Sequence, residues 1–473
     1  MPVAKGASGE DIRPVRSILD SDLYKFTMQQ AILYSPVEDP SVSYQFTNRS
    51  KNMTFTRKAY EQIHLEVKGL ASLSLSAEER MWLEKKCPYF RKEYLDWLSA
   101  FRFRPEEQVL LRFNSLKEGS GSDEIGELEI EVKGIWSEVI LYEVPLMSIV
   151  SETYFRTIDT KWDMQGQRAL AKDKARRLTQ AGILYSEFGS RRRRSYESHR
   201  LCIEGLLAGE KEALASHGGS VGPGKLLGTS NVHFAQMFDL TPIGTVAHEW
   251  TMAIAALEGY DYANLRALQY WESVYCPPAF QPQSPADDLT IALTDTFSSK
   301  VFFKDLLETP EGREIGKRWR GLRQDSGDSK VFARKAVEVY KSLGIDPKKK
   351  VVIYSDGLHV EKCIELAEYS KEVGIGAGFG VGTNFTNDFR VADDPSPRAD
   401  PDATPRSGGV SKPLNIVIKI SRVKGVPAVK ISDELTKNTG DKEEIRLVKE
   451  RFHLEESEAS TASTAGGSSS ATS

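Results

Sequence analysis

Hydrophobic and polar positions follow two different rhythms along the chain, and the change falls near residue 156. In the first part, "DSDLYKFTMQQAILY" is typical of a helix that begins after an N-cap at Asp20 or Ser21. "SVSYQFTNR" alternates apolar and polar residues, which predicts a half-buried strand. Residues 125–146 carry a further strand pattern with a turn at Lys133–Gly134. Helix and strand mix here without regular order, so we expect an N-terminal α+β domain over residues 17–155.

A regular alternation of short apolar runs, polar turns and helical stretches covers residues 156–390. The turns are "EFGSRRRRS", "LLGTSN", "IGTVAHEW", "IALTDTFSS", "GLRQDSGD", "VVIYSDG" and "AGFGVGTN". This repeated order predicts a parallel sheet or an α/β barrel, and the number of turns favours a barrel over an open sheet. In such barrels the catalytic residues lie at the carboxyl ends of the strands, which here are the polar turns.

The remaining segments differ in composition from these two domains. Residues 391–411, "VADDPSPRADPDATPRSGGVS", have too few apolar residues to form a core, which predicts a disordered insertion. Residues 412–455 contain a predicted hairpin that turns at Lys424–Gly425, followed by a helix. The first 16 residues are predicted to be a flexible arm, and the low-complexity residues 456–473 a disordered tail.

Composition limits the class of protein. The chain has 473 residues, 40% of them hydrophobic and 27% charged, with a net charge of −4, which is typical of a globular protein without a drive toward nucleic acid or anionic membranes. We find neither an apolar run of roughly 18 residues nor a secretory signal, so we expect a cytosolic protein, with a nuclear location left open. The cysteines lie far apart and are predicted to be reduced thiols: Cys87, Cys202, Cys276 and Cys363.

The turn "GLRQDSGD" carries the densest set of reactive side chains. Arg323 offers a fork of donors that matches carboxylate or phosphate, and Asp325 and Asp328 are candidate Mg²⁺ ligands. The alternative is a polar turn that caps the following helix. Asp295 and Asp356 end neighbouring predicted strands. Together these carboxylates and arginines suit a polyanionic substrate that binds with Mg²⁺.

Three other turns carry candidate chemistry. Gly228–Asn231 and Gly380–Thr383 offer backbone N–H groups and hydroxyls, which are the components of a phosphate cradle, although a structural turn is the alternative. A run of arginines such as Arg191–Arg194 is usually a solvent-exposed face. Here the run follows a predicted strand, so one or two of these arginines can point into a site. His248, in "GTVAHEW", can act as an acid–base group or accept a phosphoryl group, whereas most isolated histidines are structural.

Taken in order, these strings resemble those of nicotinate phosphoribosyltransferases, in the type II phosphoribosyltransferase group, over residues 17–452. The matching strings are "LDSDLYKFTM", "LYEVPLMSIVSE", "FGSRRR", "GTSNV", "GTVAHEW", "LTDTF", "GLRQDSGD", "YSDG", "GFGVGTN" and "KPLNIVIKI". The resemblance implies an N-terminal sandwich-like domain, an irregular α/β barrel, and a C-terminal hairpin that returns to the first domain.

The resemblance also implies a reaction. Nicotinate would react with phosphoribosyl pyrophosphate to give nicotinate mononucleotide and pyrophosphate, in NAD biosynthesis. Mg²⁺ would be the cofactor, and ATP hydrolysis would be coupled through a phosphohistidine, which places the enzyme in the ligase class. The phosphohistidine matches His248. A homodimer is compatible with this family.

Individual positions take roles from this resemblance and from the turns described above. The predicted catalytic residues are His248, Asp325 and Asp356, and the predicted metal ligands are Asp325 and Asp328. Nicotinate contacts match Tyr24, Thr245 and Arg323, the sugar-phosphate contact matches Thr383, and Arg191 and Arg192 match basic residues of the site. Ser230, Ser326, Gly380 and Gly382 complete the predicted substrate-binding set.

Two alternatives remain at this level. Nicotinamide phosphoribosyltransferases carry an acidic residue at the position of Ser230, where an aspartate would accept a bond from an amide and repel a carboxylate. Serine does not repel a carboxylate, which favours the acid as substrate. A Schiff-base aldolase with a barrel fold would need a lysine on a central strand, for which Lys300 and Lys419 are the weak candidates.

Overall fold

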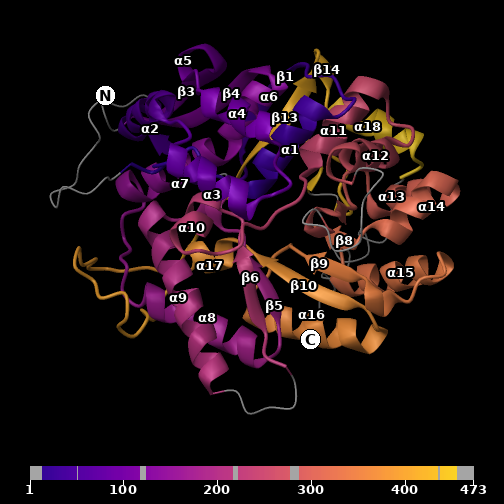
Figure 1. Cartoon of the computed structure of the whole chain (residues 1–473). Coiled ribbons are helices and arrows are strands. Elements are labelled where there is room, and N and C mark those ends of the chain that lie inside the picture. The colour runs from indigo at the N-terminus through magenta and orange to yellow at the C-terminus, as the bar shows by residue number, and fades with distance from the viewer. Residues whose placement is uncertain are drawn as a thin grey trace, which may run out of the picture.

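The computed structural model describes residues 13–50, 52–117, 124–216, 222–276, 287–434 and 437–454. Two six-stranded sheets organise these residues, one antiparallel and one parallel, and helices cover both (Figure 1). Within this described part of the chain, no helix is long and apolar enough to cross a membrane.

The antiparallel sheet belongs to the N-terminal half. Its strand order is β14-β13-β1-β4-β2, with β3 paired to β4. The strands are β1 (Ser41–Asn48), β2 (Phe55–Thr56), β3 (Val109–Lys117), β4 (Ile125–Ile135), β13 (Ile416–Val423) and β14 (Val426–Pro427). The surrounding helices are α1 (Leu23–Tyr34), α2 (Arg57–Gly69), α3 (Ala77–Lys86), α4 (Lys92–Ala100), α5 (Pro105–Gln108), α6 (Trp136–Val139) and α7 (Glu143–Thr157). β1 buries every second residue, as its alternation predicted.

Two local predictions in this half are wrong. The strand pattern of residues 125–146 ends at Ile135, and the apolar run that follows is helical and buried on every side, so its sequence does not alternate as a strand does. The N-cap of α1 is Asp22 rather than Asp20 or Ser21, and Asp22 makes no side-chain capping bond.

The parallel sheet has the strand order β6-β5-β10-β9-β8-β7. Its strands are β5 (Leu184–Glu187), β6 (Lys225–Thr229), β7 (Ile291–Leu293), β8 (Gly321–Gln324), β9 (Val351–Tyr354) and β10 (Gly376–Val381). Its helices are α8 (Gln167–Gln180), α9 (Tyr196–Ala215), α10 (Val232–Met237), α11 (His248–Glu258), α12 (Ala263–Tyr275), α13 (Ser299–Glu308), α14 (Pro310–Arg318), α15 (Ser329–Ser342), α16 (Val360–Val373) and α17 (Thr383–Thr386).

Six of the seven predicted polar turns follow strands of this sheet, and the exception is "IGTVAHEW". Residues 243–247 form no strand and lead directly into α11. The pairings of the described residues leave β6 and β7 as the two edges, so closure of the sheet into a ring stays a prediction.

The C-terminal segment connects the two halves. β13 pairs antiparallel with β1, and the β13–β14 hairpin turns at Lys424–Gly425, both with positive φ, as predicted. The chain then returns to the parallel sheet, where the Ile431 N–H donates to the Thr296 carbonyl at 2.7 Å. The helix α18 (Lys442–Arg451) follows and packs its buried Val448 in a cluster with Phe297. This path carries Lys430 to the parallel-sheet half, where it lies beside His248.

Residues 391–411 have a defined path, which corrects the prediction of disorder. The segment begins after β11 (Phe389–Arg390) and ends in β12 (Val410–Ser411), which pair with each other. The Asp163 carboxylate, 4% exposed, accepts bonds from Arg406 and from the Ser396 N–H. The Arg168 N–H at the start of α8 donates to the Pro401 carbonyl at 3.0 Å. Hydrogen bonds and ion pairs hold this polar loop where an apolar core is missing.

The predicted arm and tail lie largely beyond these ranges. Residues 1–12 and 456–473 are outside the described residues. Residues 13–16 pack on the body, because Val15 is buried and the Pro14 carbonyl accepts a bond from Arg193 at 2.6 Å.

Candidate active site

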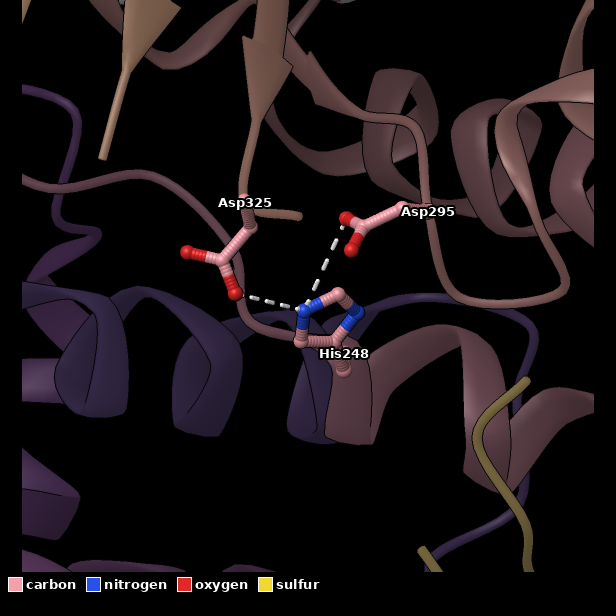
Figure 2. Close-up of side chains that lie close together, drawn as sticks. All are labelled: His248, Asp295 and Asp325. Atoms are coloured by element: carbon pink, nitrogen blue, oxygen red, sulfur yellow. Dashed lines mark hydrogen bonds and ion pairs between the residues drawn. The ribbon is translucent and has the colours of Figure 1, made fainter. Parts of the chain in front are cut away.

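The side chain of His248 lies at the centre of a buried polar cluster. Its Nδ1 is 3.1 Å from Thr296 Oγ1, and its Nε2 is 3.0 Å from Asp325 Oδ2 and 3.8 Å from Asp295 Oδ1. Figure 2 shows both carboxylates directed at the same ring nitrogen. The Nζ of Lys430 lies 2.9 Å from Nε2 as well. Nε2 can therefore donate to Asp325 or accept from Lys430, depending on which ring nitrogen carries the proton.

Strand ends and a helix start bring these residues together. Asp325 follows β8 directly and Asp295 follows the neighbouring strand β7, and β7 and β8 are parallel, so their carboxyl ends meet at one edge. His248 is the first residue of α11, which delivers the imidazole to that edge. Lys430 comes from the C-terminal segment after β14.

Burial decides the charge of the two central groups. Burial and the neighbouring Lys430 ammonium lower the pKa of His248 to about 4, although Asp295 and Asp325 oppose this shift. Burial would raise the pKa of Asp325, but Arg323, His248 and Lys430 hold it well below its usual range. At neutral pH the cluster therefore pairs a neutral imidazole with an ionised carboxylate. A neutral imidazole nitrogen can act as a base or as a nucleophile.

The donor set of the cluster suits a divalent cation. One ligand atom each from His248, Asp295 and Asp325 lies within 4.8 Å of the others. The Oδ1 atom of Asp295 is buried and has no hydrogen-bond partner, so it has an unused acceptor position. Carboxylate oxygens are the ligands that Mg²⁺ prefers.

Asp328 does not take part, which corrects the predicted Asp325–Asp328 metal pair. Its Oδ1 accepts the N–H groups of Lys330 and Val331 at 2.8 Å and 2.9 Å and so caps α15. The first N–H groups of a helix have no partner inside it, and an N-cap carboxylate satisfies them. The capping alternative was therefore right for Asp328, while Asp325, three residues earlier, belongs to the cluster.

The other residues of the "GLRQDSGD" turn support the cluster. The Arg323 guanidinium donates to Asp325 Oδ1 at 3.1 Å and to Ser355 Oγ at 3.0 Å. Ser326 Oγ donates to Asp295 Oδ2 at 2.5 Å. Both predicted substrate-binding side chains thus already hold carboxylates of the cluster in place. Asp356, by contrast, forms an ion pair with Lys437 at 2.8 Å and has no described contact with the cluster.

The four consecutive arginines divide into two pairs. Arg191 and Arg192 are electrostatic neighbours of Asp325, and burial lowers the pKa of Arg192 to about 10. Arg193 makes two bonds of 2.8 Å to Asp20, and Arg194 donates to Asn387 and Ser411, so these two arginines are buried structural groups. The run lies in and after a short 3-10 helix (Ser190–Arg192) and not in a strand. Arg191 and Arg192 are thus the two candidates for the site, and the expectation that one or two of the four face it stays a prediction.

Tyr24 lies close to Arg191, and Thr245 lies in the loop before His248. Tyr24 is 3% exposed, and its hydroxyl has no hydrogen-bond partner. The Arg191 guanidinium lies 5.8 Å from the centre of the Tyr24 ring. The Thr245 carbonyl accepts a bond from Thr27 on α1, which ties the loop before His248 to the helix of Tyr24. A buried hydroxyl without a partner is a donor that a ligand can use.

The two predicted phosphate cradles differ. In Gly228–Asn231, Ser230 Oγ donates to Asp22 at 2.7 Å and the Ser230 N–H donates to the Glu187 carbonyl at 2.8 Å. The hydroxyl and N–H of Ser230 are thus occupied by hydrogen bonds within the protein, which corrects the prediction that this turn is a phosphate cradle. In the second turn, an added Cβ at Gly380 or Gly382 would lie 3.3 Å or 3.1 Å from Phe188, and Thr383 begins α17. The first N–H groups of that helix have no helical acceptor, which suits phosphate.

Sequence reasoning missed two lysines of this region as site residues. Lys430 lies in no string that pointed to chemistry, and only its distance from His248 identifies it. Lys419 was considered only as an aldolase lysine. It lies on β13, where burial and the cations Lys430 and Arg191 lower its pKa to about 8, against the opposing effect of Glu143. Alternation along β13 could have placed Lys419 on one face but could not say what that face meets.

Comparisons with known proteins agree with this geometry. The model of the nicotinate phosphoribosyltransferase (NAPRTase) family matches residues 183–456, and the model of the NAPRTase N-terminal domain matches residues 19–151. A Schizosaccharomyces pombe protein named "Probable nicotinate phosphoribosyltransferase" is 40% identical over 93% of this chain and 98% of its own length. The Saccharomyces cerevisiae nicotinate phosphoribosyltransferase is 37% identical over 93% of this chain and 95% of its own length.

A solved structure extends the likeness to three dimensions. The crystal structure of nicotinate phosphoribosyltransferase from Vibrio cholerae superposes with a TM-score of 0.77 at 31% identity, covering 94% of this chain and 95% of that chain. Both halves of the fold, and therefore the junction between them, take part in these matches. The resemblance carried by the sequence strings is confirmed: the chain belongs to the nicotinate phosphoribosyltransferase family.

Proposed function

We propose that this protein transfers the phosphoribosyl group of phosphoribosyl pyrophosphate to nicotinate, with ATP hydrolysis coupled to the transfer through phosphorylation of His248. The observation that carries the coupling is the imidazole of His248, held neutral between Thr296 on one ring nitrogen and Asp325, Asp295 and Lys430 on the other. Thr296 can orient the ring through Nδ1 and leave Nε2 to attack the terminal phosphoryl group of ATP. Membership of the family supports the phosphoribosyl transfer itself.

Cations around the cluster support a polyanionic substrate. Arg191, Arg192, Lys419 and Lys430 converge with Asp325 at the junction of the two sheets. Positive groups that are fixed before the reaction stabilise the charge that develops on a leaving pyrophosphate. The positive charge that develops on the ribose would face Asp325, because Asp356 is paired with Lys437.

Mg²⁺ is the proposed cofactor. Asp295 and Asp325 would hold it, since their oxygens are close together and Oδ1 of Asp295 has an unused acceptor position. Bound there, the ion would neutralise charge on phosphate oxygens. The chain's own residues would bind and orient the substrates. Tyr24 and Arg191 would lie near nicotinate, and Gly380, Gly382 and Thr383 would lie near the sugar phosphate.

One assay series tests the proposal. Purified protein is incubated with radiolabelled nicotinate or nicotinamide, phosphoribosyl pyrophosphate and Mg²⁺, with and without ATP. We expect mononucleotide from nicotinate, a higher yield with ATP, and little product from nicotinamide. Equal turnover of the two bases would contradict the assignment of the acid as substrate and would favour the nicotinamide enzyme.

A variant tests the coupling separately. His248→Asn should remove acid-labile phosphate from the protein and abolish ATP hydrolysis, while some uncoupled phosphoribosyl transfer remains. The matched control is His199→Asn, because His199 is buried against Glu187 outside the cluster. Persistence of the acid-labile phosphate in His248→Asn would exclude His248 as the acceptor.

A further inference from the structure

Two carboxylates flank Arg191, and each is held by a donor other than Arg191. The nearest oxygen of Glu143 lies 3.4 Å from Arg191 Nη1, whereas another oxygen of Glu143 lies 2.5 Å from Lys25 Nζ. Asp22 lies 3.8 Å from Arg191 Nε, while Ser230 donates to it at 2.7 Å. The Arg191 side chain is 34% exposed. Its guanidinium thus makes one long hydrogen bond, from Nη1 to Glu143, and a longer ion pair with Asp22, and it has no short, two-pronged carboxylate partner among the described residues.

Lys25 is placed to hold Glu143 in this position. Its side chain is fully buried on α1, between Glu143 of α7 and Glu249 of α11, each at 2.5 Å. Burial alone would lower the pKa of Lys25, but the two carboxylates raise it above its usual value, so the ammonium stays charged. Glu249 has further donors in Tyr44 at 2.5 Å and Trp136 at 2.9 Å, whereas the hydrogen-bond and ion-pair partners of the Glu143 side chain among the described residues are the cations Lys25 and Arg191.

We propose that Lys25 is a positioning residue that keeps the Glu143 carboxylate from closing into a short, two-pronged ion pair with Arg191, so that the guanidinium fork remains available for an anionic group of a substrate. Without Lys25, Arg191 is the nearest cation left to the buried Glu143, with Lys419 as the next. A buried carboxylate must be paired, so Glu143 would turn and form a two-pronged ion pair with Arg191. That pair would compete directly with a bound ligand.

The ligand is named by its chemistry, a carboxylate or phosphate whose two oxygens match the guanidinium fork. Its source rests on the proposed function, in which it is the carboxylate of nicotinate or a phosphate of phosphoribosyl pyrophosphate. Separate KM values for these two substrates distinguish the sources. In Lys25→Met, the KM of the substrate that binds Arg191 should rise about tenfold, and kcat should change less, because the loss is one of binding.

Two double variants separate positioning from a general loss of structure. Lys25→Met/Glu143→Gln removes the carboxylate that would close on Arg191, so it should return KM to within about threefold of the wild type. Lys25→Met/Glu249→Gln removes the other carboxylate that Lys25 holds, and so removes the same amount of buried negative charge. Glu143 can still close on Arg191 in this variant, so KM should stay high. Equal recovery in both double variants, or none in the first, overturns the proposal.

A single variant keeps the test decisive if Lys25→Met does not fold. Glu143→Gln leaves Lys25 paired with Glu249, and we expect its KM values to stay within about threefold of the wild type, because Glu143 is not needed to open Arg191. A tenfold rise in this variant would mean that Glu143 itself orients Arg191, and would overturn the proposal.

The control for burial is Lys350→Met. Lys350 is a buried lysine whose ammonium donates to the carbonyls of Lys317 and Trp319. It directly precedes β9, so it lies at the amino ends of the parallel strands, away from the site. Its loss should lower the melting temperature and leave KM unchanged. A rise in KM in Lys350→Met as large as in Lys25→Met would attribute the effect to lost stability and overturn the proposal.

Calorimetric titration with nicotinate and with pyrophosphate measures the affinity of each variant for these anions directly, without turnover. A wild type that binds these anions but does not convert nicotinate contradicts the proposed function alone. An unchanged affinity in folded Lys25→Met contradicts the role of Lys25 alone.

Discussion

At the scale of single residues, the environment of His248 changes its chemistry more than its position in the sequence could indicate. The imidazole is 4% exposed, and burial with Lys430 lowers its pKa from 6.5 to about 4. A histidine with the ordinary pKa of 6.5 would be partly protonated near neutral pH. The shift keeps the ring neutral without any contact from a bound substrate.

This shift predicts how stability depends on pH. Between about pH 6.5 and pH 4 the unfolded chain binds a proton at residue 248 that the folded protein does not, so stability is lost as the pH falls. The loss from this residue should reach about 3 kcal/mol at pH 4. Denaturant unfolding at pH 7, 5.5 and 4.5 measures it. In His248→Gln the slope of stability against pH should be shallower, and identical slopes in the two proteins would contradict the shift.

Asp325 and Asp328 should respond differently to mutation although three positions separate them. Asp328→Ala removes the cap of α15 and should cost about 1 kcal/mol of unfolding free energy with kcat retained. Asp325→Asn keeps the shape of the side chain but removes the charge beside His248, so we expect a large loss of kcat. Unfolding curves and initial rates of both variants test this pair, and a loss of kcat in Asp328→Ala would return Asp328 to the site.

At the scale of elements, the 391–411 segment shows how a polar loop can be part of the fold. Its partners are the residues that lead into α8, and the ion pairs cross more than 200 positions of sequence. Loop closure over such a length adds little extra entropy cost, so a few good hydrogen bonds suffice to hold the segment.

Replacing Asp163 by Asn should therefore destabilise the protein. Asp163 is buried and accepts bonds from Arg406, Ser396 and Gln165, so we expect a loss of about 1–3 kcal/mol of unfolding free energy. The matched control is Asp402→Asn, whose ion pair with Arg168 is exposed and should contribute less than about 1 kcal/mol. Thermal unfolding compares the two, and equal melting temperatures would mean that the segment contributes nothing.

At the scale of the whole molecule, the C-terminal segment joins the two halves and completes the site. β13 adds a strand to the N-terminal sheet beside β1 (Figure 1). The residues after β14 place Lys430 against His248 at the ends of the parallel strands. The site thus depends on a contact between the two halves and not on the parallel sheet alone.

Truncations at two places test this dependence. A chain that ends at Lys412 lacks β13, Lys419 and Lys430, exposes the edge of β1, and should aggregate and lose nicotinate turnover. A chain that ends at Glu455 removes only the low-complexity residues 456–473 and should keep its melting temperature and activity. Static light scattering, thermal unfolding and turnover distinguish the two, and an active chain ending at Lys412 would show that the segment is not needed.

The sequence by itself determined the family, the parallel order of strands and turns, and most of the candidate residues. These features are local: a strand, its polar turn and the next helix are contiguous, so their pattern can be read within about 20 residues. The strings around Asp325, His248 and Arg191 carry their chemistry in the same local way, and for this reason the central residues were found.

Only the tertiary structure decided which of those residues meet. Asp325 and Asp328 look alike in sequence, but one faces His248 and the other caps a helix, because the end of β8 and the start of α15 direct them apart. Lys430 is 182 positions from His248, and its approach depends on the pairing of β13 with β1. Charge and protonation depend on burial among partners distant in sequence, which no local pattern contains.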